Sequence, residues 1–183
     1  MSAVYPLKIA IVGPESCGKS TLAAALAVRL RGIGLQVALV DEYAREYYAQ
    51  RAYRPTLADV MAIAEGQMAR EAAASGDVVL CDSTALTCRI WAEVGFGQVP
   101  APLAELDHRG YALTLLARPD IPWQHDPLRS HPYARDALFG RYRQALAAME
   151  GCPVAEVVGD GEARVACAWD ALAPLLPVSC AAG

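Results

Sequence analysis

The stretch Leu7–Ser20, LKIAIVGPESCGKS, decides the fold. Its first part, Leu7–Val12, is a short apolar run rich in β-branched residues, which predicts a buried parallel strand. The second part matches the spacing G-x-x-x-x-G-K-S at residues 13–20. From Lys19 to about Leu30 the pattern predicts a helix. A strand, a glycine-bearing loop and a helix in this order predict a loop whose backbone N–H groups cradle phosphate.

The side chains of this phosphate loop have expected roles. Lys19 is expected to reach the β- and γ-phosphates of ATP and to act in catalysis, and Ser20 to offer its hydroxyl to Mg²⁺. Cys17 has two interpretations, either a small side chain that fits the loop or a thiol made reactive by the helix end. The residues expected to bind the nucleotide here are Gly13, Glu15, Ser16, Cys17, Gly18, Lys19, Ser20 and Thr21.

Strands and helices alternate along the rest of the chain. Strands are predicted at 37–40, 77–81, 111–117 and 154–158, and helices at 55–74, 84–94, 103–109, 133–149 and 161–175. This alternation predicts a five-stranded parallel sheet with helices on both faces, a three-layer α/β sandwich of the P-loop kinase type. We expect one domain over residues 1–183, with a lid near 118–132 and a frayed tail at 177–183.

Ligands of such sheets bind outside the carboxyl ends of the strands, where two of the strands are closed by carboxylates. Asp82 closes the third strand and is expected to contact Mg²⁺, with an N-cap of the next helix as the alternative. Asp41 and Glu42 close the second strand. A carboxylate here is expected to hold the acceptor or take its proton, with a solvated turn as the alternative. Arg45 can pair with these carboxylates or face phosphate.

Two further segments are expected at the site. Arg118–Arg129 has arginines at both ends, and lid arginines stabilise charge on a transferring phosphoryl group. Trp123 within it can stack on a ligand or pack the lid down. Beyond the fifth strand, Arg164 is expected near the base of ATP.

Composition excludes several classes of function. The chain has 183 residues and a formal net charge of −4, without the basic stripe of a nucleic-acid binder. No apolar run reaches the roughly 18 residues of a membrane span, and the first residues lead us to expect no signal peptide. The six cysteines lack metal-binding or redox spacing. We expect a cytoplasmic protein that acts on a small molecule, with no nucleic-acid partner.

Five segments resemble the ribosylnicotinamide kinase domain of NadR-type proteins: IAIVGPESCGKST (9–21), EYAREY (42–47), IAEGQ (63–67), CDSTALTCRIWAE (81–93) and RPDIPWQHDPLR (118–129). The resemblance implies an ATP- and Mg²⁺-dependent kinase that phosphorylates the 5′-hydroxyl of nicotinamide riboside. It places Glu42 at the acceptor, Asp82 at Mg²⁺, and Trp123, Asp126 and Arg129 in the lid. The expected catalytic residues are Lys19, Glu42, Asp82 and Arg129. Those expected to bind the acceptor are Glu42, Tyr43, Arg45, Asp82, Trp123 and Asp126.

The chain departs from the family pattern at Thr84, where an aspartate is usual, and at His125 and Pro127 in the lid. These departures keep open a kinase of another nucleoside, nucleotide or vitamin alcohol. An ATP-sensing module without turnover is a further alternative. A GTPase is disfavoured, because the chain has no asparagine for a guanine-specificity loop.

Overall fold

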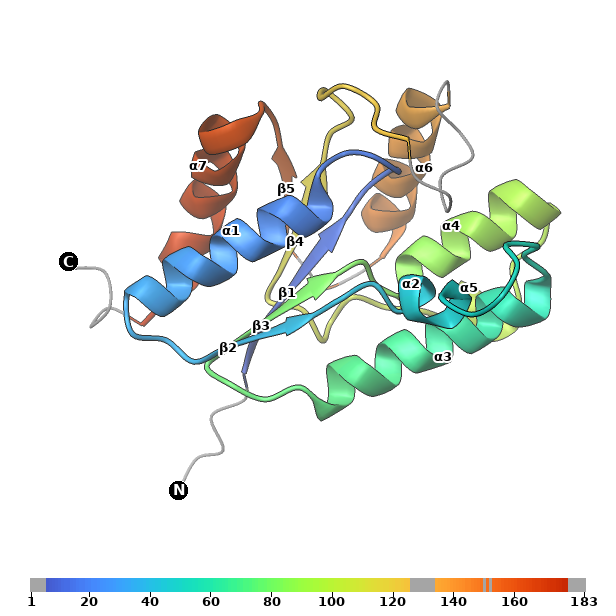
Figure 1. Cartoon of the computed structure of the whole chain (residues 1–183), viewed down its shortest axis with the longest axis horizontal. Helices are drawn as coiled ribbons and strands as arrows, with labels where there is room; N and C mark the ends of the chain where they lie inside the picture. Colours follow the sequence, from blue (N-terminus) through green and yellow to red (C-terminus); the bar gives the residue numbers. More distant parts are fainter. Residues whose placement is uncertain (1–5, 126–133, 150, 152, 178–183) are drawn as a thin grey trace.

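The computed structural model describes residues 6–125, 134–149, 151 and 153–177. In this part of the chain five strands form one parallel sheet in the order β2-β3-β1-β4-β5 (Figure 1). The strands are β1 (Leu7–Val12), β2 (Val37–Val40), β3 (Val78–Asp82), β4 (Leu113–Ala117) and β5 (Val154–Val157). The predicted fold class is confirmed.

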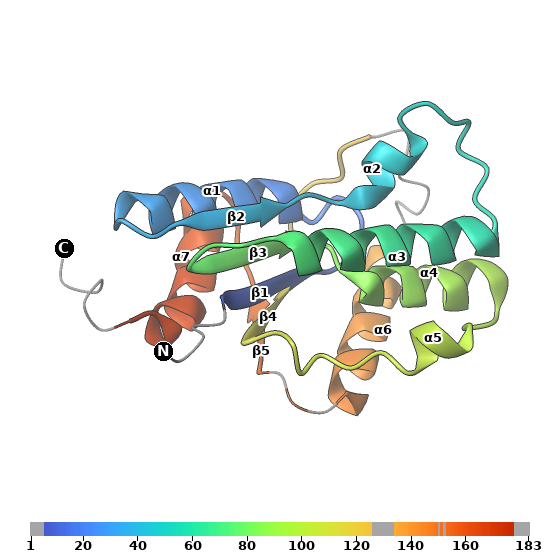
Figure 2. The ribbon, with the colours of Figure 1, turned by 90° about the horizontal axis from the view of Figure 1, so that it is seen from below.

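Helices cover both faces of this sheet (Figures 1 and 2). They are α1 (Lys19–Gly32), α2 (Tyr43–Tyr48), α3 (Leu57–Ala73), α4 (Ala85–Phe96), α5 (Ala101–Ala104), α6 (Arg135–Ala148) and α7 (Gly161–Leu172), followed by a 3₁₀ turn, Ala173–Leu175. In the described ranges, no helix combines the length and apolar character needed to cross a membrane.

The alternation of side chains along β1 explains the layers. Ile9 and Ile11 point to one face, where they pack in a buried cluster with α1 and α7. Ala10 and Val12 point to the other face, where they pack against α4 and α6. A strand that is apolar on both faces must be covered on both, so the run Leu7–Val12 occupies the centre of the sheet.

One helix was not predicted, and the bounds predicted for another were wrong. The segment after β2 contains the short helix α2, which is held by the packing of its aromatic residues on α3 rather than by strong helix propensity. The helix predicted at 103–109 is instead Ala101–Ala104, because Pro100 caps it and Pro102 stands in its first turn.

The strand order places the phosphate loop at a switch point of the sheet. From β1 the chain reaches β2 and β3 on one side, then crosses to β4 and β5 on the other. Parallel strands end at the same edge, so the loop after β1 meets the residues that follow β2, β3 and β4. Ligands of open parallel sheets bind at this position.

The buried imidazole of His108 makes stability depend on acidity. His108 is 3% exposed and its Nδ1 lies 3.1 Å from the Thr114 hydroxyl. Burial lowers its pKa from 6.5 to about 4. The stability that depends on the neutral ring is therefore complete above pH 6.5 and is lost as the pH falls toward 4, by up to about 3 kcal/mol.

We expect His108→Gln to reduce this loss, since the amide can still bond Thr114 and does not titrate. Urea unfolding of both proteins at pH 7 and pH 4.5 measures the difference. Equal pH dependence in the two proteins would contradict the role given to His108.

Candidate active site

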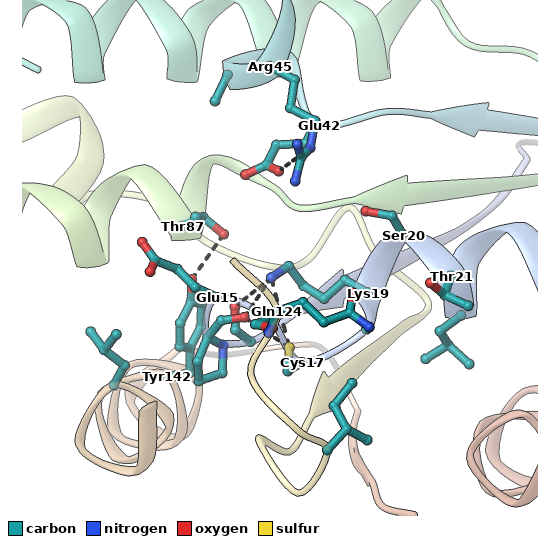
Figure 3. A pocket seen from close by; sticks show the side chains of 18 of the residues that line it. Glu15, Cys17, Lys19, Ser20, Thr21, Glu42, Arg45, Thr87, Gln124 and Tyr142 are labelled. Atoms are coloured by element: carbon teal, nitrogen blue, oxygen red, sulfur yellow. Dashed lines mark hydrogen bonds and ion pairs between the residues drawn. The ribbon is translucent and has the colours of Figure 1, made fainter. Parts of the chain in front are cut away.

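A cavity of about 350 Å³ opens at the carboxyl edge of the sheet. The phosphate loop forms one wall, with the amino end of α7 beside it. Residues of α2, α4 and α6 form the opposite wall, and Ile121, Pro122 and Gln124 close one side. Figure 3 shows Glu42 and Arg45 reaching in from α2, across the cavity from Lys19. The cavity therefore joins the loop to the residues that follow β2.

The phosphate loop is fitted closely to the neighbouring strand. Gly13 has φ +143°, and a Cβ there would lie 2.5 Å from the carbonyl oxygen of Ala117 at the end of β4. Only glycine tolerates both the backbone conformation and this approach. At the other end of the loop, Gly18 stands at the N-cap of α1, and no side chain in the described part of the chain caps that helix. The first N–H groups of α1 are thus suited to bind an anion.

Lys19 lies along the inside of the loop. Its ammonium donates to the carbonyl oxygens of Gly13 at 3.0 Å and Pro14 at 2.8 Å. Burial alone would lower its pKa, but nearby acidic groups outweigh burial and raise that pKa. Those groups are Cys17, Tyr142, Glu42 and Asp82. Lys19 is therefore a fixed positive charge at neutral pH, placed where phosphate oxygens would approach.

Ser20 and Asp82 form a pair that fits Mg²⁺. The Asp82 carboxylate is 3% exposed and accepts a hydrogen bond from the Ser20 hydroxyl. Its Oδ1 has no partner among the described residues. Burial raises the pKa of Asp82, while Lys19 and Ser20 oppose the shift. A buried, half-satisfied carboxylate beside a hydroxyl matches Mg²⁺, which binds one or two carboxylates and takes further ligands from phosphate and water.

The alternative role of Asp82 as a helix cap was wrong. Asp82 is the last residue of β3, and the N-cap of α4 is Thr84, whose hydroxyl accepts from the N–H of Leu86. The residue that differs from the family pattern is therefore occupied in capping a helix. Aspartate performs the same task well, and Thr84 is not among the residues that line the main cavity.

Arg164 lines the cavity but acts as a structural clamp. It is 4% exposed, and its guanidinium donates to the carbonyl oxygens of Cys17 at 2.7 Å and Arg118 at 2.6 Å and to Asp120 at 2.7 Å. These bonds tie the phosphate loop to the segment after β4. Sequence reasoning expected Arg164 beside the base of ATP and missed these contacts.

Cys17 is fully buried, and its thiol donates to the carbonyl oxygen of Pro14 at 2.9 Å. This position supports the interpretation of a small side chain that fits the loop.

Glu42 and Arg45 approach the cavity together from α2. Glu42 stands at the N-cap of that helix, and its Oε2 lies 3.4 Å from Nε of Arg45. The Arg45 side chain is 44% exposed, so this ion pair is weak. Glu42 is half-buried, and its charge contributes to the raised pKa of Lys19. A carboxylate that faces the ammonium across the cavity is well placed to hold a hydroxyl of a second substrate.

The end of the cavity beyond Glu42 is aromatic. It is lined by Tyr48, Tyr53 and Trp91, and Thr87 and Tyr142 also line the cavity. The Tyr48 and Tyr53 rings meet edge to face at 5.0 Å. The Tyr48 hydroxyl is buried without a partner in the described residues. Burial raises its pKa to about 12, so the group keeps its proton and can donate. This end suits a planar ring that carries an acceptor.

Sequence reasoning missed most of this aromatic end. Thr87 and Trp91 lie four residues apart on α4, so their spacing places them on one helix face, and this signal was available. No local pattern indicated Tyr142. It lies on α6, and its bond to the Thr87 hydroxyl at 3.2 Å joins positions 55 apart in sequence (Figure 3).

The segment after β4 contacts the phosphate loop directly. The N–H of Gln124 donates to the Ser16 hydroxyl at 2.7 Å, and Arg135 donates to the carbonyl oxygens of Ser16 and Ile121 at 3.1 and 2.9 Å. The Arg135 guanidinium lies 5.9 Å from the Trp123 ring centroid. Trp123 is half-buried and is not among the residues lining the cavity, which supports packing rather than stacking on a ligand.

The predicted lid arginines have different outcomes. Arg118 lies 4.0 Å from Glu156 of β5 and is absent from the cavity lining, so the structure gives no support to its suggested role at the phosphoryl group. Asp126 and Arg129 fall outside the described residues, and their predicted roles stay predictions.

Tyr43 was expected to contact the acceptor, and this expectation stays a prediction. It does not line the cavity. Its ring instead packs on the backbone of α3 at Gly66, where a Cβ would come within 2.1 Å of the ring. Tyr43 thereby anchors the start of α2, the helix that carries Glu42 and Arg45.

The protein family described as an AAA domain matches residues 8–164. The chain belongs to this family. The match begins in β1 and ends at Arg164, so this AAA domain spans the phosphate loop, both carboxylate positions and the clamp. No relative was found among curated proteins.

Solved structures similar to this AAA domain include two kinases. A deoxyadenosine kinase from M. mycoides, with dCMP and dCDP bound, gives a TM-score of 0.63 at 15% identity and covers 92% of this chain and 100% of its own. A thymidylate kinase from Ehrlichia chaffeensis gives 0.62 at 16% identity, covering 93% and 99%. At these identities the likeness concerns the fold, which is a P-loop fold found in nucleoside and nucleotide kinases.

Proposed function

We propose that this protein is an ATP- and Mg²⁺-dependent kinase that phosphorylates the 5′-hydroxyl of nicotinamide riboside to give nicotinamide mononucleotide, a step of NAD salvage. The observation that carries the proposal is a single cavity that holds both the phosphate loop and, across from it, the Glu42 carboxylate and the aromatic end. The motif resemblance and the kinase fold of the similar structures support the same assignment.

The proposed reaction is a direct in-line transfer. Lys19 and the N–H groups of the loop hold the phosphates and stabilise charge on the moving phosphoryl group. Glu42 accepts a hydrogen bond from the acceptor hydroxyl, orients it and takes its proton. Ser20 and Asp82 would hold Mg²⁺, which when bound would supply positive charge beside the phosphate oxygens. Most of the acceleration is expected from positioning and electrostatics.

The aromatic end of the cavity favours an acceptor with a flat ring. Tyr48, Tyr53 and Trp91 offer aromatic surface, and the buried Tyr48 hydroxyl offers a donor to a ring substituent. A carboxamide oxygen, such as that of nicotinamide, fits this donor. The kinase of another nucleoside remains the second candidate, because the similar structures include kinases that act on deoxyadenosine and thymidylate.

A panel of acceptors tests the proposal. The purified protein is incubated with ATP, Mg²⁺ and one acceptor at a time: nicotinamide riboside, adenosine, deoxyadenosine, thymidine, thymidylate or thiamine. We expect formation of ADP and monophosphate with nicotinamide riboside. Turnover of another acceptor with none of nicotinamide riboside would move the assignment to that acceptor. Tight ATP binding without transfer to any of them would favour an ATP-sensing module.

Glu42→Gln is expected to lower kcat by about a hundredfold while leaving ATP affinity within about twofold, since a general base contributes on this scale and Glu42 lies away from the loop. The matched control is Asp41→Asn, which removes the adjacent, exposed carboxylate. Steady-state rates and ATP titrations of both variants measure the contrast. Equal loss of rate and ATP binding in Glu42→Gln would mean that Glu42 is structural.

A further inference from the structure

Gln67 lies where the two carboxylate-bearing strand ends meet helix α3. It is 2% exposed and is not among the residues that line the main cavity. Its Oε1 accepts from the N–H of Tyr43 at 2.9 Å, and its Nε2 donates to the carbonyl oxygen of Ser83 at 3.2 Å. Tyr43 directly follows Glu42, and Ser83 directly follows Asp82. One buried amide therefore links the backbones beside both carboxylates.

The orientation of this amide is fixed by its partners. The N–H of Tyr43 can only donate and the carbonyl of Ser83 can only accept, so the oxygen must face Tyr43 and the nitrogen Ser83. The second hydrogen of Nε2 points to Glu71 Oε1 at 3.5 Å, and Glu71 in turn accepts from the Tyr111 hydroxyl at 2.5 Å. A buried amide bonded to two backbone segments in this way holds its neighbours rigidly.

The backbone at Ser83 needs such support. Its φ is 69°, in the left-handed region that non-glycine residues seldom adopt. Strained conformations of this kind persist only where surrounding contacts enforce them, and they gather at functional sites. Two bonds hold Ser83: its N–H donates to Ile11 of β1 at 3.0 Å, and its carbonyl accepts from Gln67.

Gly66, the residue before Gln67, also contacts Tyr43. The Tyr43 ring packs against Gly66, so two consecutive residues of α3 bind one residue of α2, the first its ring and the second its N–H. Glycine in a helix interior lowers the stability of the helix relative to alanine. Its presence at position 66 is explained by this contact.

We propose that Gln67 is a positioning residue that fixes Glu42 and Asp82 relative to each other, and that it sets the rate of phosphoryl transfer without touching either substrate. The inference rests on the proposed kinase function. Gly66 assists by admitting the Tyr43 ring, so that α3 acts as the template on which both strand ends are placed.

Gln67→Met tests this directly, because methionine has a similar length but lacks the amide. We expect kcat to fall about ten- to a hundredfold, as misplacement of reacting groups predicts, with KM for ATP within about twofold. Hydrogen exchange should become faster in peptides spanning 41–48 and in those spanning 82–88. Exchange is measured without substrate, so this readout does not depend on the reaction.

One control variant separates an effect on positioning from an effect on stability. Leu172→Ala removes a fully buried side chain from α7, on the other face of the sheet, and should lower stability without changing kcat.

A second test is Gly66→Ala, which should lower kcat as Gln67→Met does. Gly140→Ala in α6, where a Cβ would meet no neighbour within 4 Å, should leave kcat unchanged.

The outcomes distinguish failure of the role proposed for Gln67 from failure of the proposed function. Unchanged exchange in either peptide of Gln67→Met overturns the proposal, as does a change in kcat no larger than that of Leu172→Ala. If the unmodified protein turns over no acceptor, the proposed function fails. Faster exchange in both peptides would then still establish that Gln67 holds the two strand ends.

Discussion

Replacing Lys19 by alanine is expected to lower kcat at least about a hundredfold, roughly 2.7 kcal/mol of activation free energy. The ammonium lies within the loop on the carbonyls of Gly13 and Pro14, and its raised pKa keeps it charged. In the proposed phosphoryl transfer, Lys19 would act on the charge that develops on the γ-phosphoryl group. Steady-state kinetics with ATP and nicotinamide riboside measure the loss.

Lys19→Arg is the matched variant for charge. It keeps the positive charge but places a planar, five-donor guanidinium where a compact ammonium contacts two carbonyls. We expect it also to be strongly impaired, so that geometry as well as charge is required. A near-wild-type rate for Lys19→Ala would refute the assignment of the loop as the phosphoryl-transfer site.

The second large effect is expected for Asp82→Asn, which should lower kcat at least about a hundredfold without lowering stability. The carboxylate is buried, with one oxygen unpartnered among the described residues, and burial raises its pKa. Because the folded-state pKa lies above the unfolded value, the ionised group disfavours folding at neutral pH. The asparagine amide still accepts from Ser20, so the unfolding free energy should stay equal or rise by about 1 kcal/mol.

Urea unfolding and kinetics at several Mg²⁺ concentrations measure both parts of this prediction. ATP binding without Mg²⁺ should be unchanged. A variant that retains its rate but loses stability would show that Asp82 is structural. A variant whose rate recovers fully at high Mg²⁺ would limit its role to metal affinity.

The fold followed from sequence because its signals are local. The apolar run Leu7–Val12 and the loop after it specify a central strand, a turn and a helix, and glycine and proline mark the other boundaries. The bounds predicted for the first two strands, 7–12 and 37–40, agree with the structure. Helix α2 was not predicted, because its six residues are held by tertiary packing on α3, which no local pattern encodes.

The site was predictable only where side chains lie close to a motif. The phosphate loop and Glu42 were placed at the cavity from sequence. The contacts of Tyr142 with Thr87 and of Arg164 with Cys17 join distant segments, so spacing could not predict them. Gln67 belonged to a quoted motif, but its role depends on the meeting of three elements, α2, α3 and the end of β3.

The central claim is direct transfer of the γ-phosphoryl group of ATP to a riboside hydroxyl. The most direct measurement incubates the protein with nicotinamide riboside, Mg²⁺ and ATP whose γ-phosphoryl oxygens are isotopically labelled, and weighs the products by mass spectrometry. The account predicts nicotinamide mononucleotide that carries the labelled phosphoryl oxygens, with loss of this product in Lys19→Ala. Label found only in inorganic phosphate, with nicotinamide riboside unchanged, would contradict it.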